Sequence, residues 1–180
     1  MLIGLTGFAR SGKDTAADFY CANFDFVKYS FAQPIKEAVK VMFSLNEDHV
    51  NGHLKEVVLP DLEVSPRFLM QTLGTEWGRE TVNTNVWLLA AQRKLAEKAN
   101  LSGGGFVIAD IRFENEASFI RKNGGVLLHI NRNDREKVLS HASEQGVSFM
   151  PGDININNNG ALDDLYLQLT KVISALQDVA

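Results

Sequence analysis

Residues 7–15 read GFARSGKDT, directly after the apolar run LIGLT at residues 2–6. A glycine-rich turn of the form G-x-x-x-x-G-K-[ST] between a buried strand and a helix aims backbone N–H groups and the positive helix end at a phosphate. Gly7, Gly12 and Lys13 match this pattern, but Asp14 stands where a Ser or Thr is expected. The stretch predicts a strand, a phosphate-binding turn and a helix at the start of an α/β fold.

Asp14 has two open interpretations. Its carboxylate could hold Mg²⁺ directly or through water, because hard cations prefer oxygen ligands. It could instead be an acid in the first helical turn, where the helix dipole favours negative charge. Thr15 supplies a hydroxyl one residue later. In either case, the sequence GKDT indicates a variant used for nucleotide-dependent phosphorylation.

The remainder of the chain alternates short apolar runs with amphipathic stretches, which is typical of a parallel sheet flanked by helices. Further strands are expected at 25–31, 106–110, 126–130 and 153–157. Helices are expected at 12–23, 34–45, 66–81, 85–99, 113–123 and 161–176, whereas residues 46–64 suit either a loop or a short helix. A length of 180 residues is most naturally one domain.

The composition is that of an ordinary soluble globular protein, with 45% hydrophobic and 22% charged residues. The net charge of −4 argues against a large basic surface for a nucleic acid polymer. No apolar run approaches membrane-spanning length, so we expect no membrane partner and a cytoplasmic location. The single cysteine, Cys21, excludes an internal disulfide and is expected to be a buried thiol.

A second acid follows the apolar run FVIA at residues 106–109. Ligands gather at the carboxyl ends of strands in doubly wound sheets, so Asp110 is a candidate to orient magnesium or the attacking phosphate. The alternative is a surface acid that closes the strand. Arg112 lies two residues beyond it and could clamp a phosphate with two hydrogen bonds.

Two further polar segments could bind ligands. Arg67, Gln71, Thr75 and Arg79 recur every four residues and could line one helical face if the helix continues through Gly74. A solvated face is an equally good interpretation of that spacing. The charged segment 131–152 could be a mobile lid over phosphates or a connector; its charged residues include Arg132, Arg135, Lys137 and His141.

The motifs of this chain, in their order along the sequence, resemble those of the phage-type deoxynucleoside monophosphate kinases, relatives of the adenylate-kinase-like nucleotide kinases. The resemblance covers nearly the whole chain, and MQTLGTEWGRE and IADIRFENE are its most specific parts. The motifs that carry it are GFARSGKDT, SFAQPIKEA at 30–38, SPRFLMQTLGTEWGRE at 65–80 with Val86 and Trp87, VIADIRFENEA at 107–117, HASE at 141–144 and ININNNGALDDLY at 154–166.

The resemblance implies a three-layer α/β P-loop kinase fold, with a five-stranded parallel sheet between helices. A helical acceptor-binding region would span about 33–99 and a lid about 131–152, within a single domain over 1–180. The same resemblance makes a homodimer plausible and, if the chain is phage-encoded, places it in the host cytoplasm.

The resemblance also implies roles for individual residues. The catalytic residues would be Lys13, Asp110 and Arg112, and Mg²⁺ would be held by Asp14 and Asp110. The ATP site would contain Gly7, Ala9, Arg10, Ser11, Gly12, Lys13, Asp14, Thr15, Arg132, Asn158 and Gly160, with Asn158 and Gly160 near the donor base. The site for the acceptor, a deoxynucleoside monophosphate, would contain Lys36, Arg67, Gln71, Thr75, Arg79, Arg112, Arg135, His141 and Glu144.

The reaction so implied moves the γ-phosphoryl group of ATP to the acceptor, giving ADP and a deoxynucleoside diphosphate, with no nucleophilic side chain. Two alternatives are open. One is another small-molecule kinase, similar to the phosphomevalonate or dephospho-coenzyme A kinases, with the same donor site. The other is an ATP-binding regulatory module. The many arginines outside the phosphate loop, residues 7–15, argue against this second alternative.

Overall fold

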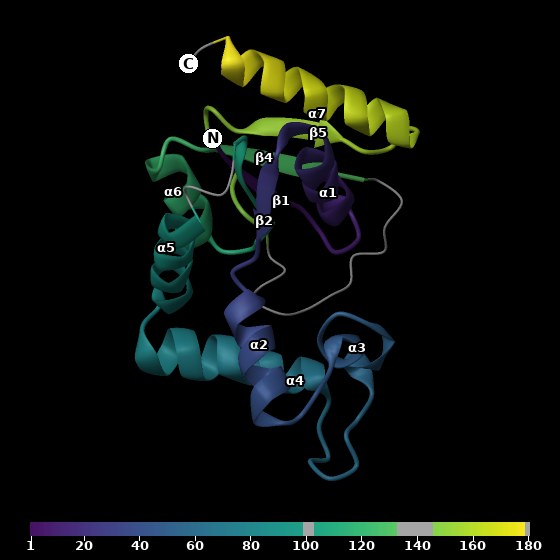
Figure 1. Ribbon diagram of the computed structural model, residues 1–180, viewed down its shortest axis with the longest axis vertical. Coiled ribbons are helices and arrows are strands. Elements are labelled where there is room, and N and C mark those ends of the chain that lie inside the picture. Colours follow the sequence, from purple (N-terminus) through teal and green to yellow (C-terminus); the bar gives the residue numbers. More distant parts are fainter. Residues whose placement is uncertain (99–102, 133–145, 179–180) are drawn as a thin grey trace. The chain divides into compact units, whose positions relative to one another are not determined.

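The computed structural model describes residues 1–98, 103–132 and 146–178 (Figure 1). Contacts divide the chain into two compact units. The first unit consists of Met1–Ser30 and Glu97–Ala180, and the second of Phe31–Ala96. The second unit covers nearly the same residues as the predicted acceptor-binding region, 33–99. That the chain forms one domain stays a prediction.

The first unit is built on five parallel strands in the order β2-β3-β1-β4-β5. They are β1 (Leu2–Thr6), β2 (Phe26–Tyr29), β3 (Gly105–Ile111), β4 (Val126–Asn131) and β5 (Ile154–Asn157). The three central strands are nearly continuous apolar runs, as expected when helices cover both faces of a sheet. The predicted five-stranded parallel sheet is therefore confirmed.

Helices cover both faces of this sheet. The main core joins Ile3 and Leu5 to Tyr20 of α1 (Lys13–Phe24) and to Leu165 and Leu169 of α7 (Leu162–Gln177). Because side chains alternate along a strand, Gly4 faces the other way, toward α6 (Glu114–Lys122). A Cβ on Gly4 would lie 2.9 Å from Cγ1 of Ile120 on that helix. This arrangement gives the three layers that were predicted.

A buried aspartate fastens the segment that leads into β5. The side chain of Asp153 is 2% exposed and accepts hydrogen bonds from Nε and Nη2 of Arg121, from the Met150 backbone N–H and from His129 Nε2. Burial raises the pKa of Asp153, but these hydrogen bonds and the charge of Arg121 outweigh it and lower the pKa to about 2. The carboxylate therefore ties this segment to α6 and β4.

The second unit is helical. It contains α2 (Gln33–Met42), α3 (Glu47–Val50), η1 (His53–Glu56), α4 (Pro66–Gln71), the π-helix η2 (Thr72–Val82) and most of α5 (Val86–Lys98). The predicted helix over 66–81 is present, and from Thr72 onward it is a π-helix rather than an α-helix. For the stretch 46–64 the sequence allowed either a loop or a short helix, and the structure has two short helices there, α3 and η1. Within the described residues, no helix has the length and apolar character needed to cross a bilayer.

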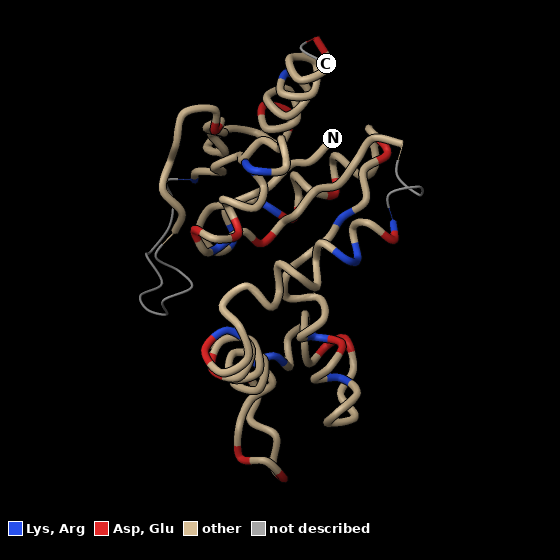
Figure 2. Tube along the Cα trace, turned by 90° about the vertical axis from the view of Figure 1, so that its left-hand side faces the viewer, with Lys and Arg blue, Asp and Glu red and all other residues tan. Residues whose placement is uncertain are grey.

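Charges are spread over both units. Lys and Arg are interspersed with Asp and Glu along the chain (Figure 2). This distribution matches the composition, in which acids slightly outnumber bases.

Candidate functional site

The loop after β1 adopts a conformation that needs glycine at two points. Gly7 has φ 141° and Gly12 has φ 108°, values that other residues rarely adopt. A Cβ on Gly7 would clash with the carbonyl oxygen of Ile130, and a Cβ on Gly12 would clash with Nδ2 of Asn158. The motif glycines of the sequence thus form the tight turn predicted for them.

Helix α1 begins at Lys13, immediately after this turn. The first N–H groups of a helix have no acceptor within the helix and carry a partial positive charge. Lys13 adds a full charge at the same point, and its Nζ donates to the carbonyl oxygens of Gly7 at 2.8 Å and Phe8 at 2.7 Å. The loop, the helix end and the lysine together concentrate positive charge at one point of an otherwise acidic chain, and such an arrangement favours an anion.

A pocket of about 390 Å³ opens at this site. Arg10, Lys13 and Arg132 supply three cationic side chains, and Asn158 and Gly160 come from the connection between β5 and α7. The volume lies in the range of small-molecule sites. The residues lining it are Arg10, Gly12, Lys13, Asp14, Thr15, Arg132, Asn158, Gly160, Leu162 and Leu165.

The pocket therefore brings together eight of the eleven predicted donor residues, from three separate parts of the sequence. Gly7, Ala9 and Ser11 belong to the same loop but do not line the pocket. Sequence reasoning missed Leu162 and Leu165. Their signal was present, because they are apolar residues three apart at the start of α7, directly after the NNNG connection.

Asp14 lies in the first turn of α1 and forms an ion pair with the neighbouring strand. Its Oδ1 is 3.0 Å from Nζ of Lys28 on β2, and Lys28 also donates to Asp18 Oδ1 at 2.9 Å. Partial burial lowers the pKa of Lys28, but the hydrogen bonds to Asp18 and Asp14 outweigh it and raise the pKa. The Asp14 side chain is 85% exposed. This position fits the helix-dipole interpretation, and metal binding stays a proposal.

Asp110 lies near the carboxyl end of β3, as predicted. Its Oδ2 accepts a hydrogen bond of 2.6 Å from the hydroxyl of Ser30, which follows β2. Burial, and secondly the negative charge of Asp110, raise the pKa of Tyr29 to about 12. The hydrogen bond from Ser30 thus holds the Asp110 carboxylate at the carboxyl ends of the strands, where parallel α/β proteins bind ligands.

Arg112 is exposed, and its backbone is held by a residue that sequence reasoning did not single out. Glu116 is 2% exposed, and its Oε2 accepts hydrogen bonds from the backbone N–H of Arg112 at 2.7 Å and of Phe113 at 3.1 Å. Glu116 is the third residue of α6, where an acid commonly reaches back to the helix start. This spacing was the signal for its role.

The predicted acceptor residues of the second unit lie on three helices. Lys36 is on α2, Arg67 and Gln71 are on α4, and Thr75 and Arg79 are on η2. Each is partly buried. Arg67 Nε lies 2.5 Å from Glu56 Oε1 in an ion pair, although its N–H does not point at the oxygen as a hydrogen bond requires.

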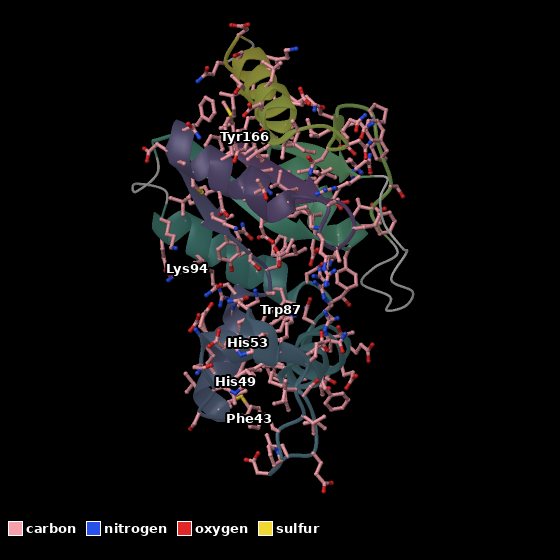
Figure 3. The ribbon with its side chains drawn as sticks, turned by 90° about the vertical axis from the view of Figure 1, so that its right-hand side faces the viewer. Phe43, His49, His53, Trp87, Lys94 and Tyr166 are labelled. Atoms are coloured by element: carbon pink, nitrogen blue, oxygen red, sulfur yellow. The ribbon has the colours of Figure 1, made fainter. Side chains whose placement is uncertain are left out.

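Trp87 of α5, labelled in Figure 3, packs on the π-helix within the second unit. Its indole Nε1 donates a 2.7 Å hydrogen bond to the carbonyl oxygen of Gly74. A Cβ on Gly78 would lie 2.5 Å from Cζ2 of the same ring, and one on Gly74 would lie 2.9 Å from Cδ1 of Ile35. The two glycines therefore provide the space in which Trp87 and Ile35 contact η2.

Three predicted acceptor residues, Arg135, His141 and Glu144, lie outside the described residues, as does most of the predicted lid. In the part of the chain that the structure describes, no group of three or more His, Cys, Asp or Glu side chains is arranged to hold a metal ion.

Comparisons with known proteins agree with these observations. The family model described as deoxynucleotide monophosphate kinase matches residues 1–62 and 46–169. The deoxynucleotide monophosphate kinase of enterobacteria phage T4 is 25% identical, with 97% of this chain and 99% of the phage protein aligned. A protein of Acanthamoeba polyphaga mimivirus, provisionally named for the same activity, is 30% identical, with 96% of each chain aligned.

Two solved structures are similar in fold. TT1252 from Thermus thermophilus has a TM-score of 0.55 at 19% identity, covering 98% of this chain and 97% of its own. The dephospho-CoA kinase from Campylobacter jejuni has a TM-score of 0.50 at 14% identity, covering 97% and 96%. At these identities, the likeness concerns the fold alone.

Proposed function

The chain belongs to the deoxynucleotide monophosphate kinase family, and on this premise we propose that it transfers the γ-phosphoryl group of ATP to a deoxynucleoside 5′-monophosphate. An oxygen of the acceptor phosphate attacks the γ-phosphorus, and the bond to the oxygen that bridges the β- and γ-phosphates breaks. The products are ADP and the deoxynucleoside diphosphate. The observation that carries the proposal is the pocket at the start of α1, with its three cationic side chains.

Different residues of the pocket bind different parts of the donor. The loop N–H groups and the helix end bind phosphate oxygens, and Lys13 offsets the charge that spreads over the transferring group. Arg10 and Arg132 add charge from two other positions. Leu162, which is 51% exposed, offers apolar surface on which the nucleoside part of ATP packs.

We propose that the reaction uses Mg²⁺ at this site. Mg²⁺ is commonly held by one or two carboxylates together with substrate phosphates, so it does not need the three-acid cluster that the described residues lack. The carboxylates that would hold it are Asp14, which lines the pocket, and Asp110, which is held by Ser30 and lies outside the pocket lining. Thr15 offers a hydroxyl. When bound, the ion would neutralise charge on the phosphates of the donor.

The predicted acceptor residues of the second unit have cationic, amide or hydroxyl side chains. Such side chains can bind the phosphate, the sugar and the base of a nucleotide. We assign Lys36, Arg67 and Arg79 to its phosphate. Gln71 and Thr75 are hydrogen-bonding groups suited to the sugar or base. Arg112, on the exposed loop after β3, contributes to the transferring phosphates. Since phosphoryl transfer asks mainly for alignment and charge compensation, no further catalytic group is required.

The decisive experiment is an ADP-release assay with ATP, Mg²⁺ and each of the four deoxynucleoside monophosphates in turn. Strong stimulation by at least one of them is expected. If none stimulates ADP release although ATP binds, the proposal fails and an ATP-binding regulatory module or a kinase for another small molecule takes its place. Ribonucleotide counterparts in the same assay measure sugar preference.

Two predictions from the sequence accompany this proposal. A homodimer would be detected by sedimentation of the purified chain. A location in the cytoplasm would be detected by fractionation of the cells that produce it.

A further inference from the structure

The side chain of Asn158 bridges the connection before α7 and the phosphate loop. Its Nδ2 donates a 2.7 Å hydrogen bond to the carbonyl oxygen of Ser11, a residue 147 positions earlier. Its backbone N–H donates at 2.8 Å to the carbonyl oxygen of Asn131, the last residue of β4. Asn158 is therefore fixed to the sheet at its backbone and to the loop at its side chain.

The bonded carbonyl belongs to the peptide unit that joins Ser11 to Gly12. In a trans peptide, the C=O and the N–H point in opposite directions. Because the Ser11 carbonyl is held toward Asn158, the Gly12 N–H is held pointing away from it. Gly12 lines the pocket, and loops of this kind bind phosphate through such backbone N–H groups.

Other contacts leave this peptide little freedom to turn. Ser11 is 2% exposed, and the N–H of the preceding peptide unit, that of Ser11 itself, donates to the Phe8 carbonyl oxygen at 3.2 Å. On the other side, Nδ2 of Asn158 occupies the space that a Cβ on Gly12 would need. The carboxamide thus fits against this one peptide unit both by hydrogen bonding and by shape.

We propose that Asn158 is a positioning residue for the donor phosphates: it fixes the Ser11–Gly12 peptide so that the Gly12 N–H is presented to phosphate. This differs from the role near the donor base that the family resemblance implied. The inference rests on the proposed function insofar as the donor is a nucleoside triphosphate. It requires the NH₂ group of the carboxamide, since a carboxylate at the same place cannot donate and would add a negative charge next to the phosphates.

The test compares two ligands, ATP and inorganic tripolyphosphate, because the second has phosphates and no base. Binding of each to the intact chain is measured by calorimetry for the wild type, Asn158→Ala and Asn158→Asp. Asn159→Ala is the matched control, since Asn159 is the exposed neighbour whose side chain bonds to Asn157. Asn158→Asp has the same size as the natural residue, so it keeps the test valid if the alanine variant does not fold.

We expect Asn158→Ala to lower the affinity for both ligands by the same factor, about 10-fold, as loss of one hydrogen bond to a buried loop implies. Asn158→Asp is expected to lower both affinities more strongly, and Asn159→Ala is expected to leave both affinities unchanged. In turnover, the KM for ATP rises and the KM for the deoxynucleoside monophosphate does not change.

Three results would overturn the inference. The first is an Asn158→Ala variant that loses ATP affinity but keeps that for tripolyphosphate, which would mean contact with the base. The second is unchanged affinity for both ligands. The third is a wild type that binds ATP but not tripolyphosphate. A wild type that binds ATP and shows no acceptor-stimulated turnover would contradict the proposed function instead, so the two failures are distinguishable.

Discussion

The phosphate loop and the π-helix η2 each contain two glycines four or five residues apart, but the two pairs serve different purposes. Gly7 and Gly12 adopt φ values of 141° and 108°, so the backbone itself demands glycine. Gly74 and Gly78 adopt no such conformation, and they are needed for the space that Ile35 and Trp87 occupy. A conformational requirement is local and marks the sequence with a motif, whereas a packing requirement depends on residues elsewhere in the chain.

The strongest test of the first pair is Gly12→Ala. The loop would force alanine into a left-handed conformation, and the new methyl group would push Asn158 off Ser11. We expect ATP affinity and turnover to fall by about 100-fold, as is typical when preorganised donors to a reacting phosphate are displaced. Calorimetric titration with ATP measures this, and a circular dichroism spectrum checks the fold. A loss below about 3-fold would show that the loop tolerates a side chain, and the contrast between the two pairs would disappear.

The corresponding test of the second pair is Gly78→Ala. Because the backbone accepts alanine there, the cost comes from the indole of Trp87, only 2.5 Å from the new Cβ. Overpacking of this kind costs about 2 kcal/mol in the free energy of unfolding. Urea denaturation measures it. The double variant Gly78→Ala, Trp87→Phe is expected to lose less than the sum of the two single changes, since the smaller ring makes room for the methyl group. Strict additivity would mean that the two residues do not compete for space.

Trp87→Phe alone removes the hydrogen bond to the Gly74 carbonyl and keeps an aromatic ring. We expect a loss of about 1 kcal/mol in unfolding free energy. Since η2 carries Thr75 and Arg79, a rise of a few fold in the KM for the deoxynucleoside monophosphate is expected, while the KM for ATP does not change. Trp77→Phe is the matched control, because Trp77 is 50% exposed. Equal effects of both tryptophan changes would remove the special role of the buried indole.

The smallest effect is expected for Asp14→Ser, which restores the usual residue of the phosphate-loop pattern. The exposed ion pair with Lys28 contributes little, about 0.5 kcal/mol or less. Turnover at saturating Mg²⁺ is therefore expected to change by less than about 3-fold. A magnesium titration separates the two interpretations of Asp14: an unchanged midpoint leaves only the helix-dipole role, whereas a shifted midpoint indicates that the carboxylate takes part in holding the ion.

The same contrast explains what could be read from the sequence. The strands are predictable because buried parallel strands are short apolar runs, and the donor loop is predictable because its glycines and Lys13 have fixed spacing. Asn158, Gly160 and Arg132 could be assigned only through the family resemblance. The structure brings them to the pocket that the loop lines.

What could not be predicted depends on contacts between distant residues. The change from α-helix to π-helix after Gln71 lies where Ile35 and Trp87 pack on η2, and neither residue reveals this in its local pattern. The hydrogen bond from Asn158 to Ser11 joins two loops with no periodicity of their own. Such features follow from the assembled sheet and helices rather than from any window of sequence.

The central claim is that the turn before α1 binds the triphosphate of the donor, and Lys13→Ala tests it most directly. Calorimetric ATP binding and ADP release with a deoxynucleoside monophosphate are measured on the same preparation. The account predicts that ATP affinity falls at least about 10-fold and turnover about 1,000-fold, because Lys13 would contact the group whose charge spreads during transfer. ATP affinity and turnover equal to those of the wild type would contradict it.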